Sequence, residues 1–174
     1  IPIKNRPGFY TIRYQIQTPP KVSIIIPTRN LGTLLNQCLE SVFTKTTYPN
    51  YDVIVIDNGS DEPETLDILS QWQTREPERF QCLPYGIPFN FARLNNLAAA
   101  KATGEMLLFL NNDTEVITPD WLECLVEQAQ RRQPGQEGKL DIEPEDTGLG
   151  QQALAEAEFP RRVAAEQGVG AEQE

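Results

Sequence analysis

The chain has 174 residues with 39% hydrophobic content, which is enough for one domain with a buried core and too short for two. The net charge is −10, but Gln133 to Glu174 hold ten acidic and three basic residues, so the acidity describes the tail and predicts no nucleic-acid partner. The sequence has no histidine, which excludes Ser-His-Asp and Cys-His catalysis and leaves oxygen-ligated Mg²⁺ or Mn²⁺ as the natural metals.

The first elements in chain order are a lead-in, a strand, a helix and a second strand. Four prolines in residues 1–20 predict a linker or an edge segment. The β-branched run Val22–Ile26, ended by Pro27, is typical of a strand that is covered on both faces. Helical spacing of apolar residues predicts an amphipathic helix over Thr33–Thr44, and Asp52–Asp57 reads as the second buried strand.

The middle of the chain predicts a helix, a weaker strand and another helix. The spacing of Asp61 and Glu64 is that of a capping box, so we expect a helix to begin there. The weaker strand lies in RFQCLPY. Asn90–Thr103 predicts the third helix, which Gly104 would end.

The last predicted strand is Glu105–Leu110, and Thr118 with Pro119 indicates the N-cap and first residue of a fourth helix. The order β-α-β-α-β-α-β-α predicts an α/β domain over residues 21–132, with a mostly parallel sheet covered by helices. Residues 133–174 form an irregular, low-complexity acidic tail, which we expect to be disordered or partly helical.

Cysteine usage and hydropathy indicate a compartment. Three widely spaced cysteines predict core thiols in a reducing environment rather than a disulfide framework or a metal motif. No apolar run approaches the ~20 residues of a membrane span, so we expect no transmembrane segment. The N-terminus lacks the basic-then-apolar pattern of a signal peptide. We expect a cytoplasmic protein, and peripheral attachment at the inner face of a membrane stays open.

Polar clusters follow the three strongest strands, at Pro27–Asn30, Asp57–Asp61 and Asn111–Glu115. Because ligands bind at the carboxyl ends of parallel strands, the three clusters are expected to converge on one site. The glycine-rich phosphate cradles of dinucleotide-binding and P-loop proteins are absent from the sequence. A diphosphate would therefore need a divalent cation to neutralise it, and Asp113 is the natural ligand.

Three segments resemble a known family: VSIIIPTRN, YDVIVIDNGSDEPET and GEMLLFLNNDTEVITPDWLE, in this order and spacing. They look like the family 2 inverting glycosyltransferases of the GT-A fold, a Rossmann-like fold. The likeness is greatest to rhamnosyltransferase-like members that build bacterial surface polysaccharides. It covers Lys21 to Arg131, the donor-binding half. The lead-in YTIRYQIQTPPK is also similar to the segment before this domain in larger multi-domain members.

The resemblance implies transfer of a sugar from a nucleoside-diphosphate sugar donor to a hydroxyl of a glycan or lipid-linked acceptor, with inversion. It places Pro27, Thr28 and Asn30 at the nucleotide. Asp57 matches an aspartate that accepts a hydrogen bond from the base, and an Asx turn in DNGS is the alternative interpretation.

The same resemblance assigns residues around the diphosphate. Asn96 matches a recurrent asparagine at the nucleotide, and Arg93 either reaches a phosphate or is a solvated helical arginine. Asp113 matches the last aspartate of the family's Asp-x-Asp motif, which binds Mn²⁺ or Mg²⁺; a polar turn or helix cap is its alternative role. Asn111 would bind the metal weakly or through water, and Asn112 reads as a spacer.

The chemistry implied by the resemblance also needs a general base, which in the family is an Asp or Glu well downstream of the metal motif. Tail carboxylates such as Glu145 and Asp146 have no setting that would make either one a base, so the base is unidentified. The sequence therefore predicts an incomplete catalytic domain. The alternative is a non-catalytic nucleotide-sugar-binding or protein-interaction module with the same fold.

Overall fold

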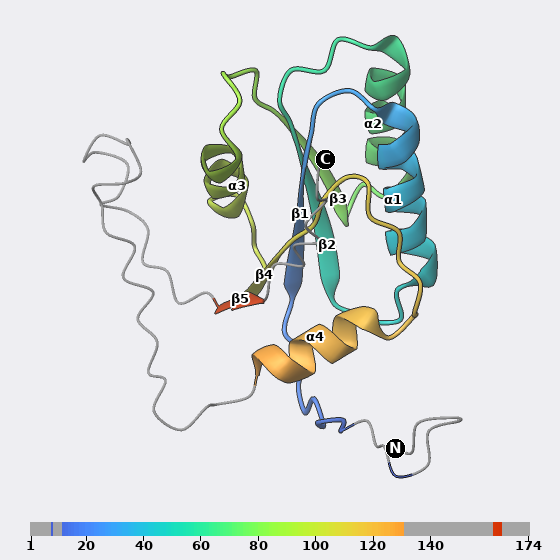
Figure 1. The fold of residues 1–174 in the computed structure, drawn as a ribbon, viewed down its shortest axis with the longest axis vertical. Helices are drawn as coiled ribbons and strands as arrows, with labels where there is room; N and C mark the ends of the chain where they lie inside the picture. The colour runs from blue at the N-terminus through green and yellow to red at the C-terminus, as the bar shows by residue number, and fades with distance from the viewer. Residues whose placement is uncertain (1–7, 9–11, 131–161, 165–174) are drawn as a thin grey trace, which may run out of the picture.

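The computed structural model describes residues 8, 12–130 and 162–164 (Figure 1). Among them, parallel strands form one sheet in the order β3-β2-β1-β4-β5. The strands are β1 (Val22–Thr28), β2 (Tyr51–Asp57), β3 (Phe80–Pro84), β4 (Met106–Phe109) and β5 (Arg162–Ala164). The helices are α1 (Gly32–Lys45), α2 (Pro63–Arg75), α3 (Phe91–Ala99) and α4 (Trp121–Ala129). The predicted α/β fold, with its alternating order and parallel sheet, is confirmed.

Helices cover both faces of the sheet (Figure 1). One core cluster joins side chains of β1, β2 and β4 to α1, α2 and α4, and a second joins the opposite face to α3. Because both faces are covered, the central strands β1 and β2 are almost wholly buried, as their apolar runs predict. Within the described ranges, none of the helices has the length and apolar character needed to cross a bilayer.

β1 continues through Pro27 to Thr28, so the predicted end of this strand at Pro27 is wrong. Proline has no N–H to donate to a neighbouring strand. The β1–β4 register ends at the pair Ile25–Phe109, and Pro27 lies beyond it. No ladder hydrogen bond to β4 is therefore lost, and the strand can carry Thr28 to the edge of the sheet.

α2 begins at Pro63 with Glu62 at the N-cap, so the predicted capping box of Asp61 and Glu64 is wrong. The carboxylate of Asp61 instead accepts a hydrogen bond from Asn30 Nδ2 at 2.8 Å. Glu64 accepts one from the first turn of α1 at 2.9 Å. Asp61 thus binds the loop after β1 and Glu64 binds α1, and neither caps its own helix.

α3 begins where the sequence predicts, since Asn90 Oδ1 accepts from the backbone N–H of Arg93 at 2.9 Å. The helix ends at Ala99, several residues before the predicted end. Gly104 packs against β1, where a Cβ would lie 2.5 Å from the backbone nitrogen of Ser23. This glycine is therefore required by close backbone approach and does not cap the helix.

The lead-in packs on α4. Arg13 forms ion pairs of 2.6 Å with both Asp120 and Glu127, and the backbone N–H of Tyr14 donates to Glu127 at 2.9 Å. Glu127 is buried, and its bond from Arg13 holds its pKa below the ordinary value. Asp120 is the N-cap of α4, so the predicted cap at Thr118 is wrong.

The end of the lead-in is bound to the start of the sheet. The carbonyl of Pro19 accepts from Asn50 Nδ2 at 3.0 Å, and that of Pro20 accepts from the hydroxyl of Tyr48 at 2.7 Å. Ile16 packs against the larger core cluster. The part of the lead-in that the structure describes is thus attached to the domain along its length.

β5 lies within the predicted acidic tail and pairs with β4 from Met106–Arg162 to Leu108–Ala164. The sequence predicts no strand there. An unpaired β4 would expose its backbone N–H and C=O groups, and pairing with β5 satisfies them. The remainder of the predicted tail lies outside the described residues.

Candidate functional site

The ends of β1, β2 and β4 lie along one side of the sheet, which we call the carboxyl edge. Thr28 and Asp57 are register partners, and each is 5% exposed. Asn112 Nδ2 donates to Thr28 Oγ1 at 3.1 Å, so the loop after β4 is bound to the end of β1. The sequence predicts that Asn112 is a spacer, but in the structure its side chain links the turn after β4 to the end of β1.

Asp57 uses one oxygen of its carboxylate within the protein. Oδ1 accepts from the backbone N–H of Ser60 at 3.0 Å and from its hydroxyl at 2.5 Å. The backbone carbonyl of Asp57 accepts from Tyr85 at 2.7 Å. The Asx-type turn considered for DNGS is therefore present. Among the described residues no hydrogen bond reaches Oδ2, so this oxygen can accept from a ligand.

Asn30 joins the loops after β1 and β2. Its Oδ1 accepts from the backbone N–H groups of Asp61 at 2.9 Å and Glu62 at 3.3 Å, and its own N–H donates to Ser60 Oγ at 2.7 Å. Asn30 has a left-handed φ of 57°, a conformation that asparagine tolerates better than most residues. The structure therefore shows Asn30 shaping the loop that follows Thr28.

The N-terminus of α1 is occupied by a protein carboxylate. Glu62 Oε2 accepts from the backbone N–H of Leu31 at 3.1 Å and from Thr65 Oγ1 at 3.1 Å. A Cβ on Gly32 would lie 2.9 Å from Thr65 Oγ1, so glycine allows the first turns of α1 and α2 to pack closely. Since a negative charge already complements this helix end, a ligand phosphate needs positive charge from another source.

Asn111 and Asp113 are both exposed in the turn after β4. The carbonyl of Asn111 accepts from Cys38 Sγ at 3.7 Å and from the N–H of Thr114 at 3.3 Å. Burial raises the pKa of the Cys38 thiol to about 12, and the nearby charge of Asp113 acts in the same direction. The backbone of the turn is therefore held while both side chains face solvent.

The donor set of this turn fits a metal that is shared with a ligand. In the described part of the chain, no three His, Cys, Asp or Glu side chains are grouped to hold a metal. Mg²⁺ commonly takes one or two carboxylates and completes its shell with waters and substrate phosphates. Asp113 and Asn111 supply hard oxygen donors of this kind, so the turn suits a metal bound together with a diphosphate.

α3 brings its first turns to the same edge. Arg93 and Asn96 are exposed, whereas Asn95 is buried and donates from Nδ2 to the carbonyl of Phe91 at 3.0 Å. Asn95 Oδ1 is buried without a hydrogen-bond partner among the described residues. Arg93 and Asn96 are thus accessible to a ligand, and their roles remain predictions.

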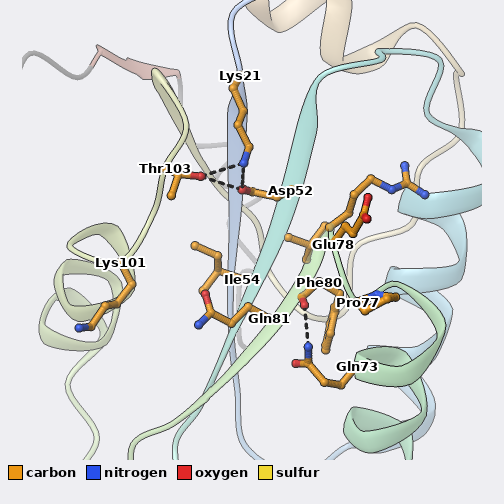
Figure 2. A pocket seen from close by; sticks show the side chains of 12 residues that line it. Lys21, Asp52, Ile54, Gln73, Pro77, Glu78, Phe80, Gln81, Lys101 and Thr103 are labelled. Atoms are coloured by element: carbon orange, nitrogen blue, oxygen red, sulfur yellow. Dashed lines mark hydrogen bonds and ion pairs between the residues drawn. The ribbon is translucent and has the colours of Figure 1, made fainter.

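A cavity of about 400 Å³ lies at the opposite side of the sheet, the amino edge, where the strands begin (Figure 2). Lys21 Nζ lies 2.6 Å from Asp52 Oδ2 and donates to Thr103 Oγ1 at 2.8 Å. Lys101 and Gln81 also line the cavity. None of the predicted site residues lines it, so this cavity is separate from the converging strand ends.

Comparison with known proteins adds an independent finding. Residues 23–150 match the family model described as glycosyl transferase family 2. The chain is 44% identical over 138 residues to the O-antigen biosynthesis protein RfbC of Myxococcus xanthus, covering 79% of this chain and 11% of RfbC. It is 42% identical over 125 residues to the uncharacterized protein y4gI of Sinorhizobium fredii, covering 72% and 14%. The chain therefore spans only a small part of the length of these relatives.

A solved structure shows the same fold. The mannosyltransferase PcManGT of Pyrobaculum calidifontis, in complex with GDP-Man and Mn²⁺, superposes with a TM-score of 0.60 at 24% sequence identity. The match covers 66% of this chain and 34% of PcManGT. At this identity, the likeness concerns the fold alone, and it agrees with the GT-A fold expected from the sequence motifs.

Proposed function

The chain belongs to glycosyl transferase family 2, and we propose that it binds the nucleoside-diphosphate sugar donor of an inverting glycosyltransferase. The observation that carries the proposal is the carboxyl edge, where Asp57 and Asp113 follow β2 and β4 on either side of β1. The name of RfbC supports a role in cell-surface polysaccharide synthesis. We place the reaction in the cytoplasm or at the inner face of the membrane, with a glycan or lipid-linked acceptor.

In this proposal the base of the donor lies against Asp57. Oδ1 is held by Ser60, which fixes the direction of the carboxylate and leaves Oδ2 to accept from an imide N–H of uracil or thymine. Pro27 and Thr28 line the nucleotide beside it. Asn30 acts indirectly, because its side chain holds the loop that follows these two residues.

The diphosphate lies towards the turn after β4. Asp113, and Asn111 directly or through water, would hold Mn²⁺ or Mg²⁺, which when bound neutralises charge on the leaving diphosphate. Asn112 donates a hydrogen bond to Thr28 and so holds this turn against the end of β1. Asp113 is therefore kept close to the strand end that would line the nucleotide. In this proposal Arg93 and Asn96, which are exposed on α3, would contact the nucleotide from the α3 face of the sheet.

The attacking hydroxyl must lose a proton to a general base. Two carboxylates at the carboxyl edge already accept hydrogen bonds within the protein. Asp57 binds Ser60, and Glu62 binds Leu31. We therefore propose that the general base lies outside the described residues. The 11% and 14% of RfbC and y4gI that this chain covers support that proposal.

The test is a calorimetric titration of uridine, thymidine and guanosine diphosphates into the 174-residue chain, with and without Mn²⁺. We expect at least one nucleotide to bind in a metal-dependent way. Donor hydrolysis, followed by release of the nucleotide, then separates two cases. Binding with hydrolysis indicates a catalytic domain, and binding without it indicates the non-catalytic module. If no nucleotide binds under either condition, the proposal is wrong.

A further inference from the structure

Positive charge is scarce at the carboxyl edge. The acids at or next to the strand ends are Asp57, Asp61, Glu62, Glu64 and Asp113. A nucleoside-diphosphate sugar would add the two negative charges of its diphosphate to this acidic edge of the sheet. In the described ranges, the arginines near this edge are Arg29, in the loop after β1, and Arg93, in the first turn of α3.

These two arginines differ from the others whose side chains the structure describes. The others pair with carboxylates: Arg13 with Asp120 and Glu127, Arg75 with Glu40, and Arg79 with Glu76. Arg29 and Arg93 are exposed and form no ion pair with any described carboxylate. The guanidinium groups of Arg29 and Arg93 therefore do not contribute to the described ion pairs that stabilise the fold, and both can bind an anionic ligand.

The position of Arg29 is held by a specific contact. Thr28 Oγ1 accepts from Asn112 Nδ2 at 3.1 Å, and Arg29 and Asp113 are the next residues on each side of this bond. A cation and an anion therefore flank the same junction between β1 and β4 without pairing with each other. From this arrangement we propose that Arg29 binds the donor diphosphate, opposite the carboxylate that faces the metal.

The side of the sheet agrees with this role. Ile25 packs in the cluster beneath α3 with Leu94, and Arg29 follows the end of β1 four positions after it. Asp57 follows Val53 and Val55, which belong to the opposite cluster. A nucleotide whose base meets Asp57 would thus cross the edge and bring its phosphates to Arg29 on the side of Arg93.

The chemistry favours an arginine at this point. A guanidinium group donates two parallel hydrogen bonds to phosphate oxygens, which a lysine ammonium cannot do. The N-terminus of α1 could also donate hydrogen bonds to a phosphate, but the N–H of its N-cap, Leu31, already donates to the carboxylate of Glu62. Arg29 therefore supplies the positive charge that the helix end does not, and this role rests on the proposed function.

The experiment compares ligands that differ only in phosphate. Uridine diphosphate, uridine monophosphate and uridine, or the matching set for the nucleotide that the wild type prefers, are titrated by NMR into the 174-residue chain. The variants are Arg29→Ala, Arg29→Lys and, as the matched control, Lys101→Ala. Lys101 is exposed, has no described ion pair and lies at the amino edge, so its removal changes the net charge equally.

We expect Arg29→Ala to weaken binding of the diphosphate by about 10- to 100-fold, the range for a hydrogen bond to a charged group. Binding of the nucleoside stays at the wild-type level, Arg29→Lys recovers part of the loss, and Lys101→Ala binds like wild type. Circular dichroism confirms folding of each variant.

Two results would overturn the inference while leaving the proposed function intact. The first is a wild-type diphosphate affinity in a folded Arg29→Ala chain. The second is equal weakening of nucleoside and diphosphate, which would place Arg29 in loop structure instead of at the phosphates. Absence of any nucleotide binding by the wild type overturns the proposed function, and the role of Arg29 with it.

Discussion

The two ends of the sheet use charge in opposite ways. At the amino edge, Asp52 is tied to Lys21 and Thr103, and Glu127 is tied to Arg13. At the carboxyl edge, hydrogen bonds join loop to loop, while Asp113 forms no ion pair with a described residue. In the described residues, the carboxylates where the strands begin form ion pairs, whereas Asp113 and Arg29, where the strands end, form none.

The reason is physical. A carboxylate that is largely removed from water is costly without a partner, so Glu127, which is buried, and Asp52, whose side chain is 14% exposed, need cations within the protein. An exposed carboxylate such as Asp113 is stabilised by water until a ligand replaces that water. Changes at the amino edge should therefore alter stability, and changes at the carboxyl edge should alter ligand binding.

The largest expected effect is that of Asp113→Ala. Loss of the proposed metal ligand should remove the metal dependence of nucleotide binding and weaken metal-supported binding by roughly 100-fold. The measurement is calorimetric titration with and without Mn²⁺. Glu115→Ala is the matched control, since Glu115 is an exposed acid two positions on that pairs with Lys45. Unchanged metal dependence in Asp113→Ala would remove this residue from the site.

Asp57→Asn should have the next largest effect. An asparagine keeps an oxygen for Ser60, and it presents an amide NH₂ where, in the proposed function, Oδ2 would accept from the base. We expect binding of the preferred imide-containing nucleotide to weaken by about 10- to 100-fold, and cytidine diphosphate, whose N3 is an acceptor, to be affected least. Titration of both nucleotides measures this. A uniform loss for all bases would show that Asp57 acts only through its turn.

Gly104→Ala should act on stability alone. The added Cβ would lie 2.5 Å from Ser23 N and 2.9 Å from the carbonyl of Lys21, both backbone atoms that cannot move without shifting β1. We expect a loss of about 1–3 kcal/mol in the free energy of unfolding, measured with urea. Gly86→Ala is the control, because a Cβ there meets nothing within 4 Å. Equal stability of the two variants would contradict the observed packing.

The smallest expected effect is a pH dependence at the amino edge. The hydrogen bond from Arg13 lowers the pKa of Glu127 below its ordinary value of 4.5 in the folded chain. The contribution of this pair is therefore complete above pH 4.5 and is lost as the pH falls below it. The difference in melting temperature between wild type and Arg13→Gln should shrink below pH 4.5. If the difference in melting temperature stays constant down to pH 3, Arg13 does not stabilise the ionised form of Glu127.

The sequence predicted β1 and β2 well because each contains a run of apolar, largely β-branched residues that is buried on both faces of the sheet. The helix starts were harder to predict. Asp61 has the spacing of a capping residue, but it binds Asn30, which lies 31 positions away. Such a contact between loops exists only after the strands are side by side, so no local pattern reveals it.

The candidate site shows the same limit. Asp57 and Asp113 could be chosen from their places at strand ends and from the family motifs. Asn112 has the same residue type as its neighbour Asn111, and only the structure shows which of the two reaches Thr28. Arg29 lies in the segment VSIIIPTRN, but only the structure shows that it forms no ion pair with a described carboxylate, whereas Arg13, Arg75 and Arg79 do.

The attached lead-in has a consequence for access to the whole domain. Arg13 and Tyr14 are bound to Glu127, and the carbonyl of Pro20 to Tyr48, so the described lead-in runs along α4 at the amino edge (Figure 1). The contacts of the described lead-in therefore lie at the amino edge, on the opposite side of the sheet from the ends of β1, β2 and β4, where we propose that the donor binds.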